Sequence, residues 1–219
     1  MSRRLFSARE GRLSLWFGGA ALALLLFVRI TRELIEGDVG ALDRAILLAV
    51  AEKRTPWLTI AAVDVTALGS VTLVVLFTAF TLVLLLVLRD RMGALQLLAA
   101  SAGAGILALV TKNMIERIRP GESQQLVAVS GFSYPSGHSV STAALYLTIA
   151  IIASCYVQHS GARAAIYLAA SAVFIMVGAS RVYLGVHYAT DVVSGISLGA
   201  AWALLLSGFF TLVGRRGSS

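Results

Sequence analysis

The segment Ser180–Asp191 places chemically active side chains between two long apolar runs. If a helix begins near His187, Asp191 lies one turn later on the same helix face. A carboxylate beside an imidazole fixes the tautomer of the ring and supports positive charge on it. An activated nucleophile or a general base needs both effects. Arg181 adds a guanidinium group whose planar fork suits phosphate oxygens.

Taken alone, this segment also fits a loop at a membrane surface, with Arg181 snorkelling to water and Asp191 capping a helix. Two other polar clusters favour the chemical interpretation. In the first, Lys112 and Arg119-Pro120 form a Lys-x6-Arg-Pro pattern. The second is the run Pro135-Ser136-Gly137-His138.

Together the three clusters predict a phosphate site. Lys112, Arg119 and Arg181 supply three cations for a dianionic phosphoryl group and for the charge that develops in its transition state. Ser136 and Gly137 stand where a helix would begin, so backbone N–H groups and the helix dipole can face an anion. Gly137 has no side chain to block close approach.

Covalent phosphoryl transfer needs two proton-handling groups, one to attack phosphorus and one to protonate the leaving oxygen. His138 and His187 supply that pair. Individually, Lys112 and Arg119 also suit interfacial anchors, and His138 suits an ordinary interfacial histidine. Asp191 is the only carboxylate at the motif positions, which is too few oxygen ligands for a divalent ion. We therefore expect no metal and no cofactor.

Composition indicates an integral membrane protein. The 219 residues are 58% hydrophobic and 13% charged, with a mean hydropathy of +0.86. A soluble domain would carry about twice that share of charge. The net charge of +7 suits anionic lipid and an anionic substrate, whereas no basic face indicates nucleic acid. We expect one all-α membrane domain over residues 1–219, in which the lone Cys155 cannot form a disulfide within the chain.

The apolar runs predict six transmembrane helices, each near the roughly 20 residues that a bilayer requires. A short amphipathic helix is expected over 39–50, with Leu42, Ile46 and Ala49 on one side. A surface helix should follow, ending at a break at Gly69-Ser70. Gly195 and Gly199 predict a close helix contact. The expected spans are 13–28, 70–88, 92–111, 139–157, 164–180 and 192–213.

Alternating spans place all three polar clusters on one face of the membrane and both termini on the other. Arginines near the termini and in the turn at 89–91 favour the cytoplasm for the termini. The site would then face the periplasm or the outside of a plasma (inner) membrane. The terminal arginines are Arg3, Arg4, Arg9, Arg12, Arg215 and Arg216.

The three clusters resemble the signature motifs of the type 2 phosphatidic acid phosphatase superfamily, with the usual spacing inside each motif, over residues 112–191. The six-span layout resembles that family's membrane-bound bacterial lipid phosphatases. The resemblance implies a phosphohistidine on His187, orientation of His187 by Asp191, and His138 as general acid. Arg117 is not a signature position and receives no role. The implied phosphate ligands are Lys112, Arg119, Ser136, Gly137 and Arg181.

The expected activity is metal-independent hydrolysis of a phosphomonoester or diphosphate lipid. Undecaprenyl diphosphate, phosphatidylglycerophosphate and phosphatidate types all fit, and the sequence leaves the oligomeric state open. A lipid phosphotransferase of the same superfamily is one alternative. A membrane transporter is a more distant one, since its charges should lie near the middle of the bilayer and here they gather at the ends of spans. The expected partners are the lipid phosphate substrate and membrane lipid, without nucleic acid.

Overall fold

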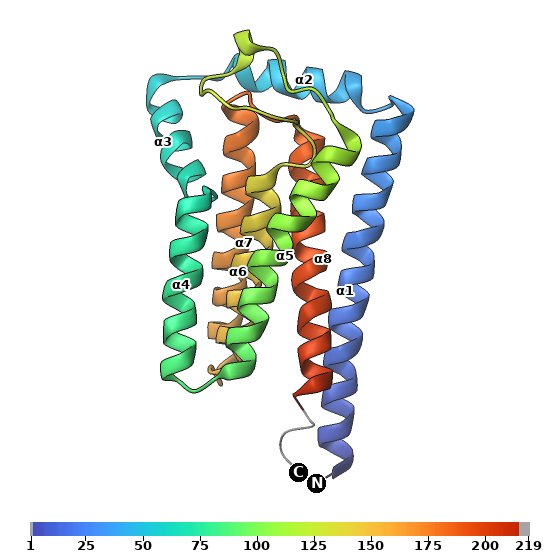
Figure 1. Ribbon diagram of the computed structural model, residues 1–219, viewed down its shortest axis with the longest axis vertical. Coiled ribbons are helices and arrows are strands. Elements are labelled where there is room, and N and C mark those ends of the chain that lie inside the picture. The colour runs from blue at the N-terminus through green and yellow to red at the C-terminus, as the bar shows by residue number, and fades with distance from the viewer. Residues whose placement is uncertain (1, 215–219) are drawn as a thin grey trace.

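The computed structural model describes the backbone of residues 2–214 and the side chains of residues 10–214. Within this part of the chain all regular secondary structure is helical (Figure 1). The short 3₁₀ helix η1 spans Glu122–Gln124. The α-helices are α1 Ser2–Glu36, α2 Gly40–Ala51, α3 Pro56–Ala67, α4 Val71–Val87, α5 Arg91–Ile115, α6 Gly137–Cys155, α7 Ser160–Tyr183 and α8 Ala189–Val213.

The predicted all-α membrane architecture is confirmed, with five or six candidate spans among the described residues. In the described residues, α1, α5, α6, α7 and α8 are each long and apolar enough to cross a membrane. A sixth span results when α3 and α4 are counted together, since they meet at a 47° bend. The expected break at Gly69-Ser70 separates α3 from α4, and α3 packs along α7.

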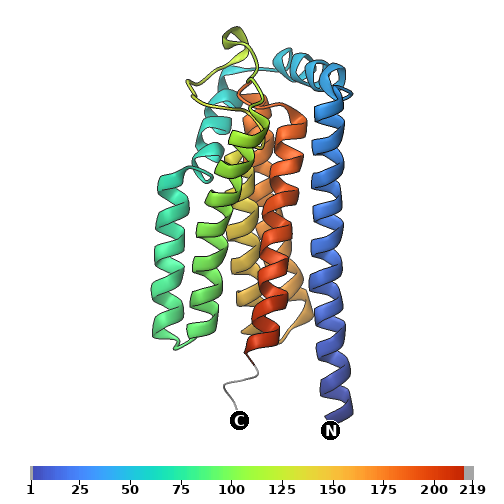
Figure 2. The same cartoon turned by 45° about the vertical axis from the view of Figure 1, so that its right-hand side comes forward.

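The helices pack around α8, which contacts α1, α5, α6 and α7 (Figure 2). Helix α6 also packs on α5 and α7, while α4 lies against α5 at the edge of the bundle. The start of α1 and the end of α8 lie at one end of the bundle (Figure 1). Helix α2 and the long loop between α5 and α6 cover the opposite end. The predicted Arg215 and Arg216 lie outside the described residues.

Small residues allow the central helices to approach closely. A Cβ atom on Gly199 of α8 would lie 2.3 Å from the carbonyl oxygen of Val140 in α6, and Gly195 is similarly enclosed. The predicted contact through Gly195 and Gly199 is therefore confirmed. Gly103 of α5 accommodates the ring of Trp202 in the same way. These close contacts fix α5, α6 and α8, the helices whose ends carry the polar motifs.

Helix α2 forms where it is expected but packs on the protein through a different face. It buries Asp43 and Leu47, whereas Leu42 is 58% exposed. Apolar periodicity cannot identify this face, because one of its two buried residues is an aspartate. The partners of Asp43 lie in the α5–α6 loop and in α8.

Candidate active site

The predicted site residues gather at the end of the bundle covered by α2 and the α5–α6 loop. His138 lies within electrostatic range of Arg181, His187, Arg119 and Lys112. The peptide N–H of Ser136 donates to the carbonyl oxygen of Asp191 at 3.0 Å, joining the second and third motifs directly. Gly137 lies beside Lys112, whose Cε atom would be 3.8 Å from an added Cβ. All eight predicted residues are thus brought to one place.

The end of α5 directs two arginines into the site. Glu116 adopts a left-handed conformation with φ of 49° and ends the helix. The chain then runs without helix, and alternation along an extended backbone places residues i and i+2 on one side. Arg117 and Arg119 accordingly both face the third motif, while Ile118 between them is 83% exposed.

A tight turn positions the third motif between α7 and α8. Gly185 has φ of 72°, and a Cβ there would lie 1.9 Å from the carbonyl oxygen of Gln124, so only glycine fits. After the turn, Oδ2 of Asp191 accepts the N–H of Tyr188 at 2.9 Å and caps α8. The same oxygen lies 3.4 Å from Nδ1 of His187. Asp191 therefore caps a helix and faces the histidine at once, which unites the two interpretations that the sequence left open.

The hydrogen bonds of His187 identify its tautomer. Nε2 lies 3.2 Å from Nη1 of Arg119, and a guanidinium group can only donate, so Nε2 accepts. The proton of the neutral ring then sits on Nδ1, which faces Asp191 at 3.4 Å and Oγ of Ser133 at 3.3 Å. Nε2 therefore carries the lone pair of the ring and directs it toward Arg119.

His187 is 2% exposed, and this burial controls its protonation. Burial lowers the pKa of His187 to about 4, against the opposing influence of Asp191, which raises it. At neutral pH the ring is uncharged and can act as a nucleophile or a base. Burial also lowers the pKa of Arg119, although Asp191 partly offsets this effect.

Ser133 is a residue of the site that the sequence analysis did not single out. Its hydroxyl donates to Oδ2 of Asp191 at 2.5 Å and is placed to accept from Nδ1–H of His187. The side chain is completely buried. Its position just before Tyr134-Pro135 was the available signal, but no spacing rule links that position to the histidine.

Arg117, left without a role by the motif pattern, lies at the centre of a buried ion network. Its Nη1 donates to Asp191 at 2.5 Å and to Thr190 at 2.8 Å. Its Nη2 donates to Asp43 of α2 at 2.6 Å. The guanidinium carbon also lies 4.2 Å from the centre of the Tyr188 ring. Although burial disfavours the charge, Asp191 and Asp43 together raise the pKa of Arg117.

The side chains of the other cations lie in the part of the site that includes His138. Lys112 Nζ donates to the carbonyl oxygen of Phe132 at 2.6 Å. Arg181 is 5% exposed and donates through Nη1 to Thr66 of α3 at 3.0 Å. Its Nε has no hydrogen-bond partner among the described residues. A buried donor without a partner is uncommon and calls for an explanation in ligand binding or strain.

The second motif begins α6 as predicted. Oγ of Ser136 accepts the N–H of Ser139 at 3.4 Å, so Ser136 is the N-cap. Gly137 and His138 form the first turn, where helix N–H groups face outward. The half-buried ring of His138 lies against Gly69, where a Cβ would be 2.9 Å from its Cδ2 atom. The break between α3 and α4 therefore leaves room for His138.

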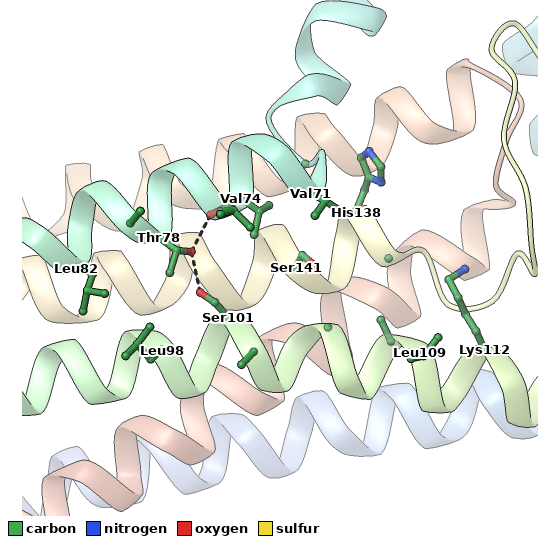
Figure 3. A pocket seen from close by; sticks show the side chains of 17 residues that line it. Val71, Val74, Thr78, Leu82, Leu98, Ser101, Leu109, Lys112, His138 and Ser141 are labelled. Atoms are coloured by element: carbon green, nitrogen blue, oxygen red, sulfur yellow. Dashed lines mark hydrogen bonds between the residues drawn. The ribbon is translucent and has the colours of Figure 1, made fainter.

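An apolar cavity of about 660 Å³ opens beside His138 and extends along α4, α5 and α6 (Figure 3). Lys112 and His138 lie at one end and Leu82 and Leu98 at the other. From Lys112 to Leu98 the α5 wall extends for roughly 21 Å. Its wall includes Ala102, Gly105 and Ala108, whose small side chains leave the space open.

The part of the chain that the structure describes contains no group of three or more His, Cys, Asp or Glu residues arranged to hold a metal ion. The functional groups of the site are imidazoles, cations, backbone N–H groups, a hydroxyl and the single carboxylate of Asp191 beside His187. They suit recognition of a phosphate anion and transfer of a phosphoryl group to a histidine.

Comparison with known proteins gives the same kind of chemistry. Residues 93–215 match the model of the PAP2 superfamily. The chain is 35% identical over 200 residues to phosphatidylglycerophosphatase B of Bacillus subtilis, covering 86% of this chain and 93% of that protein. It is 32% identical over 120 residues to lipid A 1-phosphatase of Rhizobium johnstonii, covering 51% of this chain and 45% of that protein.

A solved structure shows that the similarity extends to three dimensions. The crystal structure of a transmembrane PAP2-type phosphatidylglycerolphosphate phosphatase from Bacillus subtilis has a TM-score of 0.84 at 32% identity. The match covers 90% of this chain and 98% of that chain. Since the family model spans more than half of the sequence and this relative is similar over nearly its whole length, the chain belongs to the PAP2 superfamily.

Proposed function

We propose that this protein is a metal-independent lipid phosphate phosphatase that forms a covalent phosphohistidine on His187. The observation that carries the proposal is the junction between the histidine- and cation-lined site and the apolar cavity that begins at His138 and Lys112. A phosphate group attached to a hydrocarbon chain matches both parts. The names of the relatives, phosphatidylglycerophosphatase B and lipid A 1-phosphatase, support the same substrate class.

Lys112, Arg181 and the first turn of α6 would bind the phosphoryl group. Arg181 Nε has no partner among the described residues, so a phosphate oxygen can accept from it without displacing a protein contact. The N–H groups near Gly137 would face another oxygen at the positive end of α6. Arg119 Nη1 lies beside the attacking nitrogen and can stabilise the negative charge that develops on the phosphoryl oxygens.

In the first chemical step, Nε2 of His187 attacks phosphorus and the bond from phosphorus to the leaving oxygen breaks. His138 gives its proton to that oxygen, so a lipid alcohol leaves as a neutral group. The ring of His187 becomes a phosphorylated imidazolium, whose Nδ1–H faces Asp191 and Ser133. Both acceptors are already in place, so the positive charge develops in a preorganised environment.

In the second step, His138 accepts a proton from water, and the resulting hydroxide oxygen attacks phosphorus. The P–N bond breaks, its electron pair returns to Nε2, and inorganic phosphate leaves. His187 is again neutral and His138 again carries the proton that the next cycle needs. The second step therefore restores the proton of His138 and the lone pair of His187 that the first step uses, and no metal ion takes part.

The apolar cavity would hold part of the lipid chain along α4 and α5. Phosphatidylglycerophosphate is the first substrate to test, because the relative aligned over most of the chain carries that specificity in its name. Undecaprenyl diphosphate and phosphatidate are compared in the same assay. Transfer of the phosphoryl group to an added alcohol instead of water would indicate the phosphotransferase alternative.

The test is release of inorganic phosphate from these three detergent-solubilised lipids, with excess chelator and with vanadate. We expect turnover of at least one lipid, undiminished by chelator and inhibited by vanadate as a phosphoryl mimic. Absence of release from all three would refute the proposed function. Activity that disappears with chelator and returns with magnesium would refute the metal-independent mechanism.

We further propose that the termini are cytoplasmic and that the site faces the outside. Exposed Ser123 lies in η1 at the site end, and exposed Ser160 begins α7 at the opposite end. After Cys155→Ser, a single Ser123→Cys should react with an impermeant thiol reagent added to intact cells. A single Ser160→Cys is the matched control and should react only after the membrane is opened. The reverse labelling pattern would place the site in the cytoplasm.

A further inference from the structure

The carboxylate of Asp43 on α2 is part of the site network although it lies outside the three motifs. It is 1% exposed and accepts three hydrogen bonds. Oδ1 accepts the N–H of Thr190 at 3.1 Å, while Oδ2 accepts the Thr190 hydroxyl at 2.5 Å and Arg117 Nη2 at 2.6 Å. Every neighbour in this set donates, which suits an ionised carboxylate with no proton of its own.

Arg117 links this carboxylate to the one that serves His187. One guanidinium nitrogen binds Asp191 at 2.5 Å and the other binds Asp43 at 2.6 Å. With the charges counted, Asp43, Arg117 and Asp191 carry −1, +1 and −1, a sum of −1. Without Asp43, Arg117 would neutralise Asp191 and the sum would be zero.

The charge sum matters when His187 becomes phosphorylated. The ring then gains positive charge, and Asp191 supports it from 3.4 Å. A guanidinium on the other oxygen of Asp191 weakens that support, because it repels the same charge. A second carboxylate behind the guanidinium offsets this repulsion in a region where water cannot screen it.

We infer that Asp43 is a positioning residue which, through Arg117, balances the charge around Asp191 and so accelerates phosphorylation of His187. Helix α2, which lies across the site end of the bundle, is then part of the catalytic arrangement (Figure 1). The inference rests on the proposed phosphohistidine mechanism. It does not require Asp43 or Arg117 to touch the substrate.

A test compares Asp43→Asn with the double variant Asp43→Asn/Arg117→Gln in the lipid phosphate-release assay. Asp43→Asn sets the charge sum to zero, and kcat should fall about tenfold, as expected for one charge lost at short range in a poorly screened site. The double variant restores the sum to −1, and kcat should recover at least threefold above Asp43→Asn. KM and inhibition by inorganic phosphate should change less than twofold in both, because the phosphate ligands are untouched.

A purely structural role of the network of Asp43, Arg117 and Asp191 predicts a different result. If the network acts only by holding α2 against the loop, removing a second hydrogen-bonding side chain deepens the defect. A double variant as slow as Asp43→Asn, or slower, would therefore overturn the inference. Glu52→Gln is the matched control, since it removes one exposed carboxylate just beyond α2 and should leave kcat unchanged.

Thr190→Val provides a second route should Asp43→Asn fail to fold. Valine keeps the shape and all three charges but removes the hydroxyl that accepts from Arg117 and donates to Asp43. Charge balance predicts a loss in kcat of less than threefold, while a tenfold loss would overturn the inference. The unsubstituted protein is assayed alongside, and its failure to release phosphate would refute the proposed function itself.

Discussion

The two histidines of the site lie in contrasting surroundings. Both ring nitrogens of His187 have hydrogen-bonding neighbours, and Asp191 beside it accepts from a serine, an arginine and a backbone N–H. The ring of His138 makes no hydrogen bond to another described residue and borders the cavity. The protein thus supplies hydrogen-bonding neighbours to both ring nitrogens of His187, whereas the ring of His138 borders a cavity. This asymmetry is what a fixed nucleophile and a substrate-facing proton donor require.

The largest effect is expected from replacing His187, the histidine whose two ring nitrogens both have hydrogen-bonding neighbours. His187→Ala should lower turnover by at least roughly 10⁴-fold, because it removes the proposed phosphoryl acceptor. Radiolabelled substrate and acid quenching should reveal no phosphoenzyme with any lipid. Acid-labile label remaining on this variant would place the nucleophile elsewhere and contradict the roles proposed for the two histidines.

His138→Ala should have an effect that depends on the leaving group. A phosphomonoester must expel an alkoxide, so its turnover should fall by roughly 10²- to 10⁴-fold. A diphosphate lipid expels a phosphate, which needs little protonation, so phosphorylation of His187 should survive. Hydrolysis would still lack its base, and acid-labile phosphohistidine should accumulate. Equal losses with both substrates and no accumulation would contradict the role of His138 as acid and base.

Arg181→Lys should lower kcat/KM by roughly 100-fold even though the charge is kept. An ammonium group cannot reproduce both the bond to Thr66 and the Nε donor that has no partner among the described residues. Phosphate-release kinetics and competition by inorganic phosphate measure the effect. Arg12→Lys is the control, because Arg12 lies near the start of α1, at the end of the bundle opposite the site. Near-normal kinetics in the Arg181 variant would remove it from the phosphate ligands.

A smaller effect is expected from narrowing the cavity. Gly105 lines it, and an added Cβ would meet no atom within 4 Å. Gly105→Leu should raise KM for a long-chain lipid phosphate roughly tenfold, or about 1.4 kcal/mol of binding, while a short-chain analogue is little affected. Gly18→Leu is the matched control, because that glycine also has nothing within 4 Å but lies on α1, away from the cavity. Equal changes for both chain lengths would exclude the cavity as the chain site.

The smallest change concerns protonation between neutral and mildly acidic pH. Burial lowers the pKa of His187 to about 4, below the ordinary value of about 6.5, so its ring should stay neutral at pH 5. NMR of labelled histidine, assigned by the signal lost in His187→Ala, should give a midpoint near pH 4. Since the folded pKa lies below the unfolded one, acidification below about pH 6.5 should favour unfolding. A midpoint above pH 6 would show that His187 is not shielded as described.

Much of the architecture follows from local sequence properties. Apolar runs near the thickness of a bilayer indicate spans wherever they occur, and Gly195 and Gly199 indicate a close contact because they recur on one helix face. Alternation of the spans also predicts that the ends carrying Lys112, His138 and His187 share one side. These inferences need only length, periodicity and order along the chain.

Packing against other elements is what the sequence could not supply. The sequence did not indicate that α3 contacts α7, because its apolar residues suit a membrane and a protein neighbour equally. The predicted apolar side of α2 likewise did not indicate that Asp43 would be buried.

For the site, the sequence by itself determined which residue types could bind and transfer a phosphoryl group, and the spacing that relates His187 to Asp191. Only the tertiary structure shows that Ser133, Arg117 and Asp43 join them, since their partners lie 58, 74 and 74 positions away. Local periodicity relates residues a few positions apart along one element. Contacts between elements depend on how whole helices pack. That packing places Arg117 between Asp43 and Asp191, a position that the motif pattern did not indicate.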